Sequence, residues 1–166
     1  MNKEESLALW RQGRDAWNAW AKAMLNRRAE MERDGTWASH RNILGDEPGN
    51  EATGAWMKEA AADFQDHVFE EHADFSSFHF PGFARFDKAS FQKDAKFDSA
   101  AFCGVAWFAR ATFSGNAGFD SATFRDAWFA SVTFSGDAWF ASVTFSGDAV
   151  RECHIQRNCG IHERDI

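Results

Sequence analysis

Phenylalanine recurs along the second half of the chain in steps that alternate between five and six residues, which gives a period of eleven. One step breaks the alternation, because Phe129 follows Phe124 by five residues where six are expected. Residues 127–137 and 138–148 even repeat the same eleven letters, AWFASVTFSGD. Such regularity indicates a fold that stacks one small unit many times. The periodic positions are Phe64, Phe69, Phe75, Phe80, Phe86, Phe91, Phe97, Phe102, Phe108, Phe113, Phe119, Phe124, Phe129, Phe134, Phe140 and Phe145.

A period of eleven is also typical of right-handed helical supercoils, so a helix has to be considered. On an α-helix, steps of five and six would place successive rings near about 0°, 140° and 20°, on two separate faces. A short strand accounts for the pattern better. Alanine stands two positions before Phe in twelve of the sixteen steps, and Val132 and Val143 do so in two others. Because a spacing of two puts both side chains on one face of a strand, we predict short strands with a small and a large residue facing inward.

Turn-forming residues separate these strands. The tripeptides Ser-Gly-Asn (114–116) and Ser-Gly-Asp (135–137 and 146–148) suit corners, because Gly permits unusual φ angles and Asx side chains close local turns. One step of five or six residues buries too little apolar surface to offset its loss of chain entropy. Stacked coils supply the missing hydrogen bonds and contacts, so the pattern predicts a solenoid.

As a motif, Ala-x-Phe-x-x resembles the repeat of the pentapeptide-repeat protein family, here in a Phe-rich form with alternating spacing of five and six. The segment LALWRQGRDAWNAW, residues 7–20, is similar to the leader that many of these proteins carry before their repeats. Four pentapeptides form one square turn in that family. The resemblance implies a mainly β fold, a right-handed quadrilateral parallel β-helix of about four coils with an α-helical segment before it.

The residues before the repeats have a different composition, since five of the eight Trp precede Phe64 and no Phe does. We predict that 1–63 is an α-helical segment that packs on or caps the solenoid, that 64–149 is the repeat and that 150–166 is a non-repeat tail. Residues 1–33 are predicted to form one amphipathic helix, 45–50 a loop and 51–63 a second helix. The helical spacing of the first is carried by Leu7, Trp10, Trp17, Trp20, Met24 and Leu25.

Four sides per coil would align equivalent outward residues on successive coils. Exposed Trp beside Arg is typical of interface hot spots, so the candidate partner-binding residues are Arg85, Trp107, Trp128 and Trp139. The alternatives are that these indoles pack against the N-terminal helix or shield the strands. The predicted columns are Arg85, Trp107 and Trp128; Ser90, Thr112 and Thr133; Thr123 and Thr144; and Asp74, Lys96, Gly118 and Trp139.

No catalytic set emerges from the sequence. The repeat places Ser114, Ser135 and Ser146 at corners without a matching His, so we predict no enzyme and no cofactor. Histidines and glutamates of the first coil, and a short group in the tail, contain metal-ligand types, but their spacing is not diagnostic and we predict no metal site. These residues are His67, Glu70, Glu71, His72 and His79 in the coil and Cys153, His154, Cys159 and His162 in the tail.

Charge and composition limit the function. A net charge of −7 argues against direct nucleic-acid binding, and no run of eighteen apolar residues could span a membrane. Three scattered cysteines and the lack of a signal-peptide pattern favour the cytoplasm.

We therefore expect a non-enzymatic scaffold with an unidentified protein partner. Its last coil either pairs with that of a second copy, giving a homodimer, or is covered by Val150–Ile166. As an alternative, the resemblance implies an acidic DNA mimic that binds a type II topoisomerase. Residues 64–149 carry 11 acidic and 6 basic side chains, which is the right sign.

Overall fold

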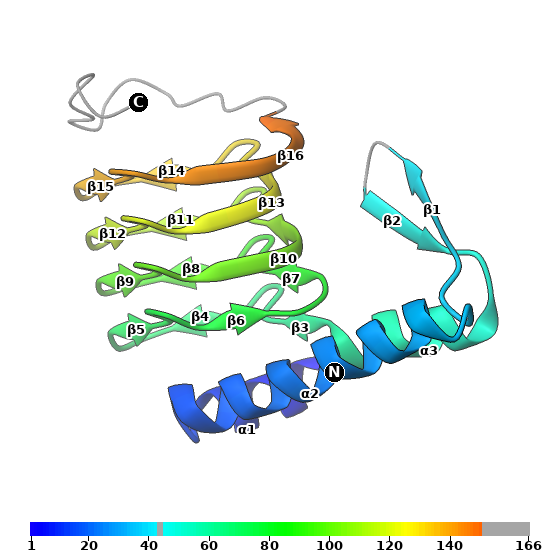
Figure 1. The fold of residues 1–166 in the computed structure, drawn as a ribbon. Helices are drawn as coiled ribbons and strands as arrows, with labels where there is room; N and C mark the ends of the chain where they lie inside the picture. The colour runs from blue at the N-terminus through cyan, green and yellow to red at the C-terminus, as the bar shows by residue number, and fades with distance from the viewer. Residues whose placement is uncertain (43–44, 151–166) are drawn as a thin grey trace.

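The structure, a computed structural model, describes residues 1–42 and 45–150 and consists of a parallel β-solenoid with helices at one end (Figure 1). Each coil has four short sides, and strands on equivalent sides of successive coils pair in parallel. The prediction of a solenoid with four sides and about four coils is confirmed. Its right-handed winding stays a prediction from the resemblance.

Three sheets make up the four sides, because three long strands turn a corner. Side 2 contains β4 (Val68–Phe69), β8 (Ser90–Phe91), β11 (Thr112–Phe113) and β14 (Thr133–Phe134). Side 3 contains β5 (Ala73–Asp74), β9 (Ala95–Lys96), β12 (Ala117–Gly118) and β15 (Ala138–Trp139). The sides are numbered in chain order within a coil, and β3 (Ala62–Asp63) and β7 (Ala84–Arg85) belong to side 1. Side 4 contains β6 (His79–Phe80). The three long strands, which run from side 4 into side 1, are β10 (Ala101–Trp107), β13 (Thr123–Trp128) and β16 (Thr144–Val150).

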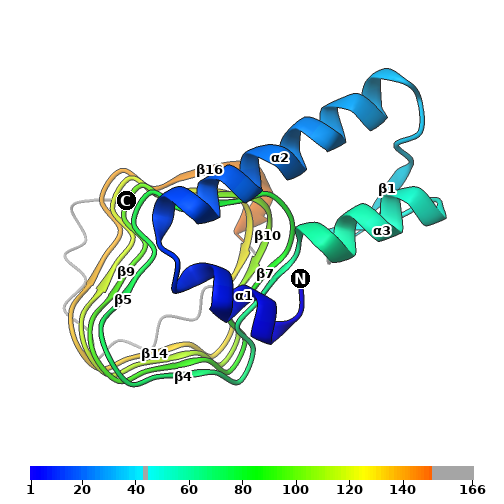
Figure 2. The same ribbon diagram turned by 90° about the horizontal axis from the view of Figure 1, so that it is seen from below.

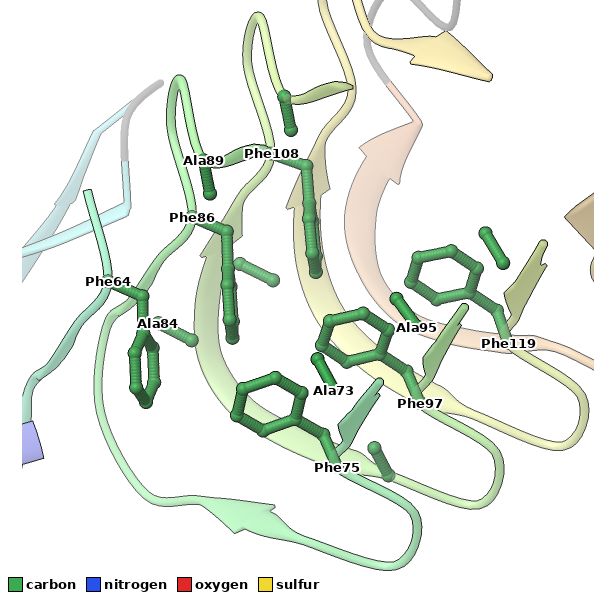
Figure 3. Packing of buried hydrophobic residues seen from close by; sticks show 14 of the residues in the cluster. Phe64, Ala73, Phe75, Ala84, Phe86, Ala89, Ala95, Phe97, Phe108 and Phe119 are labelled. Atoms are coloured by element: carbon green, nitrogen blue, oxygen red, sulfur yellow. The ribbon is translucent and has the colours of Figure 1, made fainter. Parts of the chain in front are cut away.

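Phenylalanine rings fill the interior and stack along the axis (Figure 3). Phe86 lies parallel to Phe64 and to Phe108, with 4.9 Å between ring centroids in both pairs. Rings on neighbouring sides meet edge to face, as Phe86 and Phe97 do at 5.3 Å and 89°. Both arrangements suit the charge distribution of aromatic rings. The preceding alanines, such as Ala84 and Ala95, are fully buried and leave room for the rings.

Burial decreases toward the last coil. Phe129 is 9% exposed, Phe134 and Phe140 are partly buried, and Phe145 is 39% exposed. Phe145 stacks on Phe124 at 5.4 Å, and its ring is exposed because among the described residues no strand follows β16 on side 4.

The corners use glycine differently from the expectation. Left-handed φ angles of 54–60° occur at non-glycine residues, namely Asp66, Ser77, Lys88, Ser99, Arg110, Ser121, Ser131 and Ser142. Glycine is needed instead for close approach between coils. A Cβ on Gly136 would lie 2.6 Å from the carbonyl oxygen of Gly115, which is nearer than a side chain tolerates.

Over residues 1–42 and 45–63 the structure has three helices and a hairpin, where two helices and a loop were predicted. The helices are α1 (Lys3–Trp10), α2 (Arg14–Arg33) and α3 (Glu51–Ala60), and the antiparallel hairpin is β1 (Ser39–Asn42) with β2 (Gly45–Pro48). A single helix over 1–33 is wrong because Gly13, with φ of 90°, separates α1 from α2. The predicted helix 51–63 ends at Ala60, since the first strand of the solenoid already begins at Ala62.

Helices α1 and α2 lie across the open end of the first coil (Figure 2). Trp17 is fully buried there, with its ring 5.3 Å from that of Phe80 and 5.9 Å from that of Phe64. Trp10 stacks on Phe75 at 5.4 Å. The helices thus cover the rings that a preceding coil would otherwise cover.

Side chains of the same helices also bind the exposed backbone edge of the first coil. An uncovered strand edge leaves hydrogen-bonding groups unpaired, and here polar side chains take the place of the missing strand. The bonds are Asp63 N–H to Ser6 Oγ (2.9 Å), Trp10 Nε1–H to Asp74 O (3.2 Å), Trp17 Nε1–H to His79 O (2.8 Å), Asn18 Nδ2–H to Ser77 O (2.9 Å) and His79 N–H to Asn18 Oδ1 (2.9 Å).

Candidate functional site

The tryptophan column, defined here as Arg85, Trp107 and Trp128, runs up the outside of side 1. The register pairs Arg85 with Trp107 and Trp107 with Trp128, as the sequence predicts. The two indole rings are 6.0 Å apart and tilted by 33°, and both are half-buried. Among the residues that the structure describes, the ring partner of each indole is the other one. The indoles therefore pair with each other and do not stack on the aromatic side chains of the N-terminal helices.

Arg85 is held by acidic and amide groups of its own side. It bonds to the side-chain oxygen of Gln65, and its guanidinium lies 3.6 Å from Asp87 Oδ1 and 3.9 Å from Asp63 Oδ2. Two buried polar atoms in the described part of the chain lack a hydrogen-bond partner, Asp87 Oδ1 and Trp107 Nε1. Trp107 lies on side 1, and Asp87 lies in the turn that follows this side one coil below.

Trp139 lies on side 3, which is opposite to side 1 across the coil (Figure 2). Its column contains Asp74, Lys96 and Gly118, as the sequence predicts. The side chain is 47% exposed, and Gly118 on the coil below offers no side chain to pack against it. The structure therefore separates Trp139 from the other candidate partner-binding residues.

The two predicted hydroxyl columns have the expected register. Ser90, Thr112 and Thr133 align on side 2, and Thr123 and Thr144 align on side 4. They are equivalent outward positions on neighbouring coils, so they supply a matched comparison for the tryptophan column.

The structure contains a junction between the hairpin and the corner of sides 4 and 1 that was not predicted from the sequence. Arg41 donates two hydrogen bonds to Asp126, at 2.7 and 2.9 Å, and Arg125 lies 2.7 Å from Asp46. Asp126 is only 5% exposed, so its charge depends on these partners. The sequence signal was the short step from Phe124 to Phe129, which contains Asp126 and shifts the register between β10 and β13.

Several acidic side chains of the repeat are used inside the fold. Asp94, Asp98 and Asp120 each accept a hydrogen bond from a backbone N–H of the next coil, at 2.9, 3.1 and 2.8 Å. Asp126 is neutralised at the hairpin junction. These acids connect coils to one another or to the hairpin.

The candidate metal ligands of the first coil do not converge. His67 packs edge to face on Phe69 at 4.6 Å, and burial lowers its pKa, with the positive charges of Lys3 and Arg11 adding to the effect. His72 Nδ1 lies 3.6 Å from Asp94 Oδ2. Over residues 1–42 and 45–150, no group of three or more His, Cys, Asp or Glu is arranged to hold a metal. The tail group Cys153, His154, Cys159 and His162 lies outside the described residues.

Cys103 is half-buried at the corner of sides 4 and 1. Burial raises the pKa of its thiol, and Arg28 and Arg125 oppose this effect only in part. A raised pKa disfavours the thiolate, which is the reactive form of cysteine.

Coils of four short parallel strands around stacked aromatic rings define the class of this protein as a parallel β-solenoid. Residues 75–123 and 97–150 match the family model described as Pentapeptide repeats (9 copies), and the repeat region of the chain belongs to that family. Searches among curated proteins and among solved structures gave no match. Among the helices in the described ranges, none has the length and apolar character needed to cross a membrane.

Proposed function

We propose that this solenoid is a non-enzymatic, cytoplasmic protein-binding scaffold that presents the tryptophan column to a protein partner. The observation that carries the proposal is the outward pair Trp107 and Trp128 on adjacent coils, with Arg85 below them. Trp and Arg are the residue types most enriched among side chains that dominate binding energy. A protein surface of complementary shape is therefore the ligand that suits the column best.

The rigid position of the pair supports the proposal. Trp107 ends β10 and Trp128 ends β13, and these two strands form the longest ladder on the solenoid, with five paired positions. Side chains that are already ordered lose little conformational entropy on binding, so more of their contact energy contributes to affinity. Trp139, on the opposite side, would serve a second contact and not the same one.

The DNA-mimic alternative has less support from the geometry. A mimic needs acidic groups in columns along the axis, whereas side 1 carries Arg85 below two Trp, and side 3 places Lys96 directly above Asp74. Asp94, Asp98 and Asp120 are engaged in bonds between coils. Competition between the purified protein and DNA for gyrase tests this alternative, and binding with sub-micromolar affinity would favour it over the scaffold.

Affinity capture from the source cell tests the scaffold proposal. The variant Trp107→Ala/Trp128→Ala should keep the fold but lose a partner that the unchanged protein captures. The matched control is Thr112→Ala/Thr133→Ala, which changes the same two coils on the neighbouring side and should retain the partner. Capture by both variants, or by neither, would contradict a role for the column.

The last coil is the proposed site of homodimerisation. Phe145 is 39% exposed, and β14 and β15 end their sheets within the described residues. The competing expectation, that Val150–Ile166 covers this end, concerns residues that lie almost entirely outside the described part. Light scattering over a range of concentrations, on the full chain and on a chain ending at residue 149, distinguishes the two. A strict monomer in both would contradict pairing.

A further inference from the structure

Figure 2 shows the elbow between α1 and α2 crossing the end of the first coil. Residues of this elbow and of the first coil line a cleft of about 460 Å³. Trp10 and Phe78 supply apolar walls, and polar lining comes from Arg11, Arg14, His72 and Asp74. Its size falls within the range of about 300–1,000 Å³ that is usual for small-molecule sites. None of these residues belongs to the tryptophan column, so the cleft is independent of the proposed protein-binding surface.

The positive groups of this cleft are weakly neutralised. The guanidinium of Arg11 makes no ion pair with a residue that the structure describes, and Arg14 pairs with its neighbour Asp15 at 3.3 Å. That pair is largely exposed and contributes little. Asp74 is the one carboxylate in the lining, and its Oδ1 already accepts the backbone N–H of Ser76 at 2.8 Å. The lining itself therefore has two guanidinium groups and one carboxylate, in a chain whose net charge is −7.

The aromatic wall is held in place before any ligand arrives. Trp10 stacks on Phe75 at 5.4 Å, meets Phe69 edge to face at 5.3 Å, and donates its indole N–H to the carbonyl oxygen of Asp74. The ring is only half-buried by these contacts. An indole fixed in this way offers a flat apolar surface at little entropic cost.

We propose that the cleft binds a small molecule in which an anionic group is joined to a flat aromatic ring. The anionic group lies against Arg11 and Arg14, because guanidinium groups form strong, directional hydrogen bonds with carboxylate and phosphate oxygens. The ring lies against Trp10, where offset stacking between aromatic rings is favourable. An inorganic anion or a neutral ring would each use only half of the lining.

Phenyl phosphate is a suitable probe, with inorganic phosphate and phenol as its two parts. Each is titrated into the ¹⁵N-labelled full chain, and the indole N–H signal of Trp10 reports on the site. Phenyl phosphate should shift this signal saturably and bind at least tenfold more tightly than either part. Arg11→Gln/Arg14→Gln should weaken binding at least tenfold.

The matched control is Lys22→Gln/Arg33→Gln, which removes the same charge from exposed positions of α2 outside the cleft. It should change the affinity less than twofold. No saturable shift, equal affinity in the two double variants, or inorganic phosphate binding as tightly as phenyl phosphate would each overturn the proposal. Circular dichroism and the melting temperature verify that both variants are folded, and Arg11→Lys/Arg14→Lys, which keeps the charge, should bind with intermediate affinity.

Discussion

The two halves of the fourth coil, Ala127–Asp137 and Ala138–Asp148, have the same eleven residues but different surroundings. Phe129 and Val132 of the first half are buried, whereas Phe140 and Val143 of the second are only partly buried. Both Phe rings have a ring directly below them, at 5.0 and 4.9 Å. The difference arises above, because the end of β16 continues over side 1 and pairs with Asp126 and Ala127 (Figure 1). Burial of a repeat residue thus depends on the coil that follows it as well as on its own sequence.

The outward residues of the two halves differ for a similar reason. Trp128 has Trp107 below it and is half-buried, while Trp139 has Gly118 below it and is 47% exposed. The residue before each half differs still more. Asp126 is buried and paired with Arg41, whereas the equivalent Asp137 is exposed. Stability in such an array is a sum of contacts between neighbouring coils, so identical residues make unequal contributions.

Substitution of the inward Phe rings should give the largest difference in unfolding free energy between the two halves of the fourth coil. Phe108→Ala, which empties a fully buried position, should cost about 3–5 kcal/mol, and Phe129→Ala should come close to it. Phe140→Ala should cost about half as much, because part of its ring already contacts water. Urea unfolding followed by circular dichroism measures all three. Equal losses at 129 and 140 would mean that the following coil does not determine the contribution.

A smaller but sharper difference is expected for the two aspartates. Asp126→Asn keeps the size of the side chain but removes the charge that faces Arg41 and Arg125, and should cost about 2–3 kcal/mol, since a buried charge pair is broken. Asp137→Asn, at an exposed position, should change stability by less than about 0.5 kcal/mol. The same urea experiment compares them. A neutral result at Asp126 would show that the hairpin junction contributes no stability.

The sequence predicts most of the solenoid, because its side chains repeat with the geometry that they form. Ala two residues before Phe is enough to place both on the inner face, and four sides then align Arg85, Trp107 and Trp128 correctly. The column could be found in this way. The exposed fraction of the column could not be predicted from the sequence, because it depends on which neighbouring side chains cover the two indoles.

The N-terminal part is less predictable, because its contacts join segments far apart in the chain. The apolar spacing of 1–33 is continuous through Gly13, and only the need to bend across the first coil makes this glycine a break. The pairing of Arg41 with Asp126 joins residues 85 positions apart. The short step from Phe124 to Phe129 marks the irregular position in the sequence, but it does not indicate that Arg41 pairs there. The cleft beside Trp10 arises from the same bend and has no periodic signal.

The outward tryptophans should differ modestly in stability. Trp128→Ala removes a ring that packs on Trp107 and should cost about 1–2 kcal/mol, while Trp139→Ala should cost about 0.5 kcal/mol or less. Neither change should alter the circular dichroism spectrum. Thermal unfolding measures the difference, and a loss above about 3 kcal/mol at Trp128 would indicate that the column is part of the core and is not free for a partner.

The smallest effect on stability is expected at the end of the solenoid that α1 and α2 cover. His67 packs on Phe69 in the first coil, and burial, together with Lys3 and Arg11, lowers the pKa of its imidazole below 6.5. The imidazole of His67 therefore binds a proton more readily in the unfolded chain than in the folded one. The stability that neutral His67 contributes is fully present above its unfolded pKa, and it is lost as the pH falls through about 6.5 toward the lower folded pKa. His67 is largely solvated, so the loss should be small. The melting temperature should fall less between pH 7.5 and 5.5 in His67→Gln than in the unchanged chain. An equal fall in melting temperature in His67→Gln and in the unchanged chain would remove His67 as a source of the pH dependence.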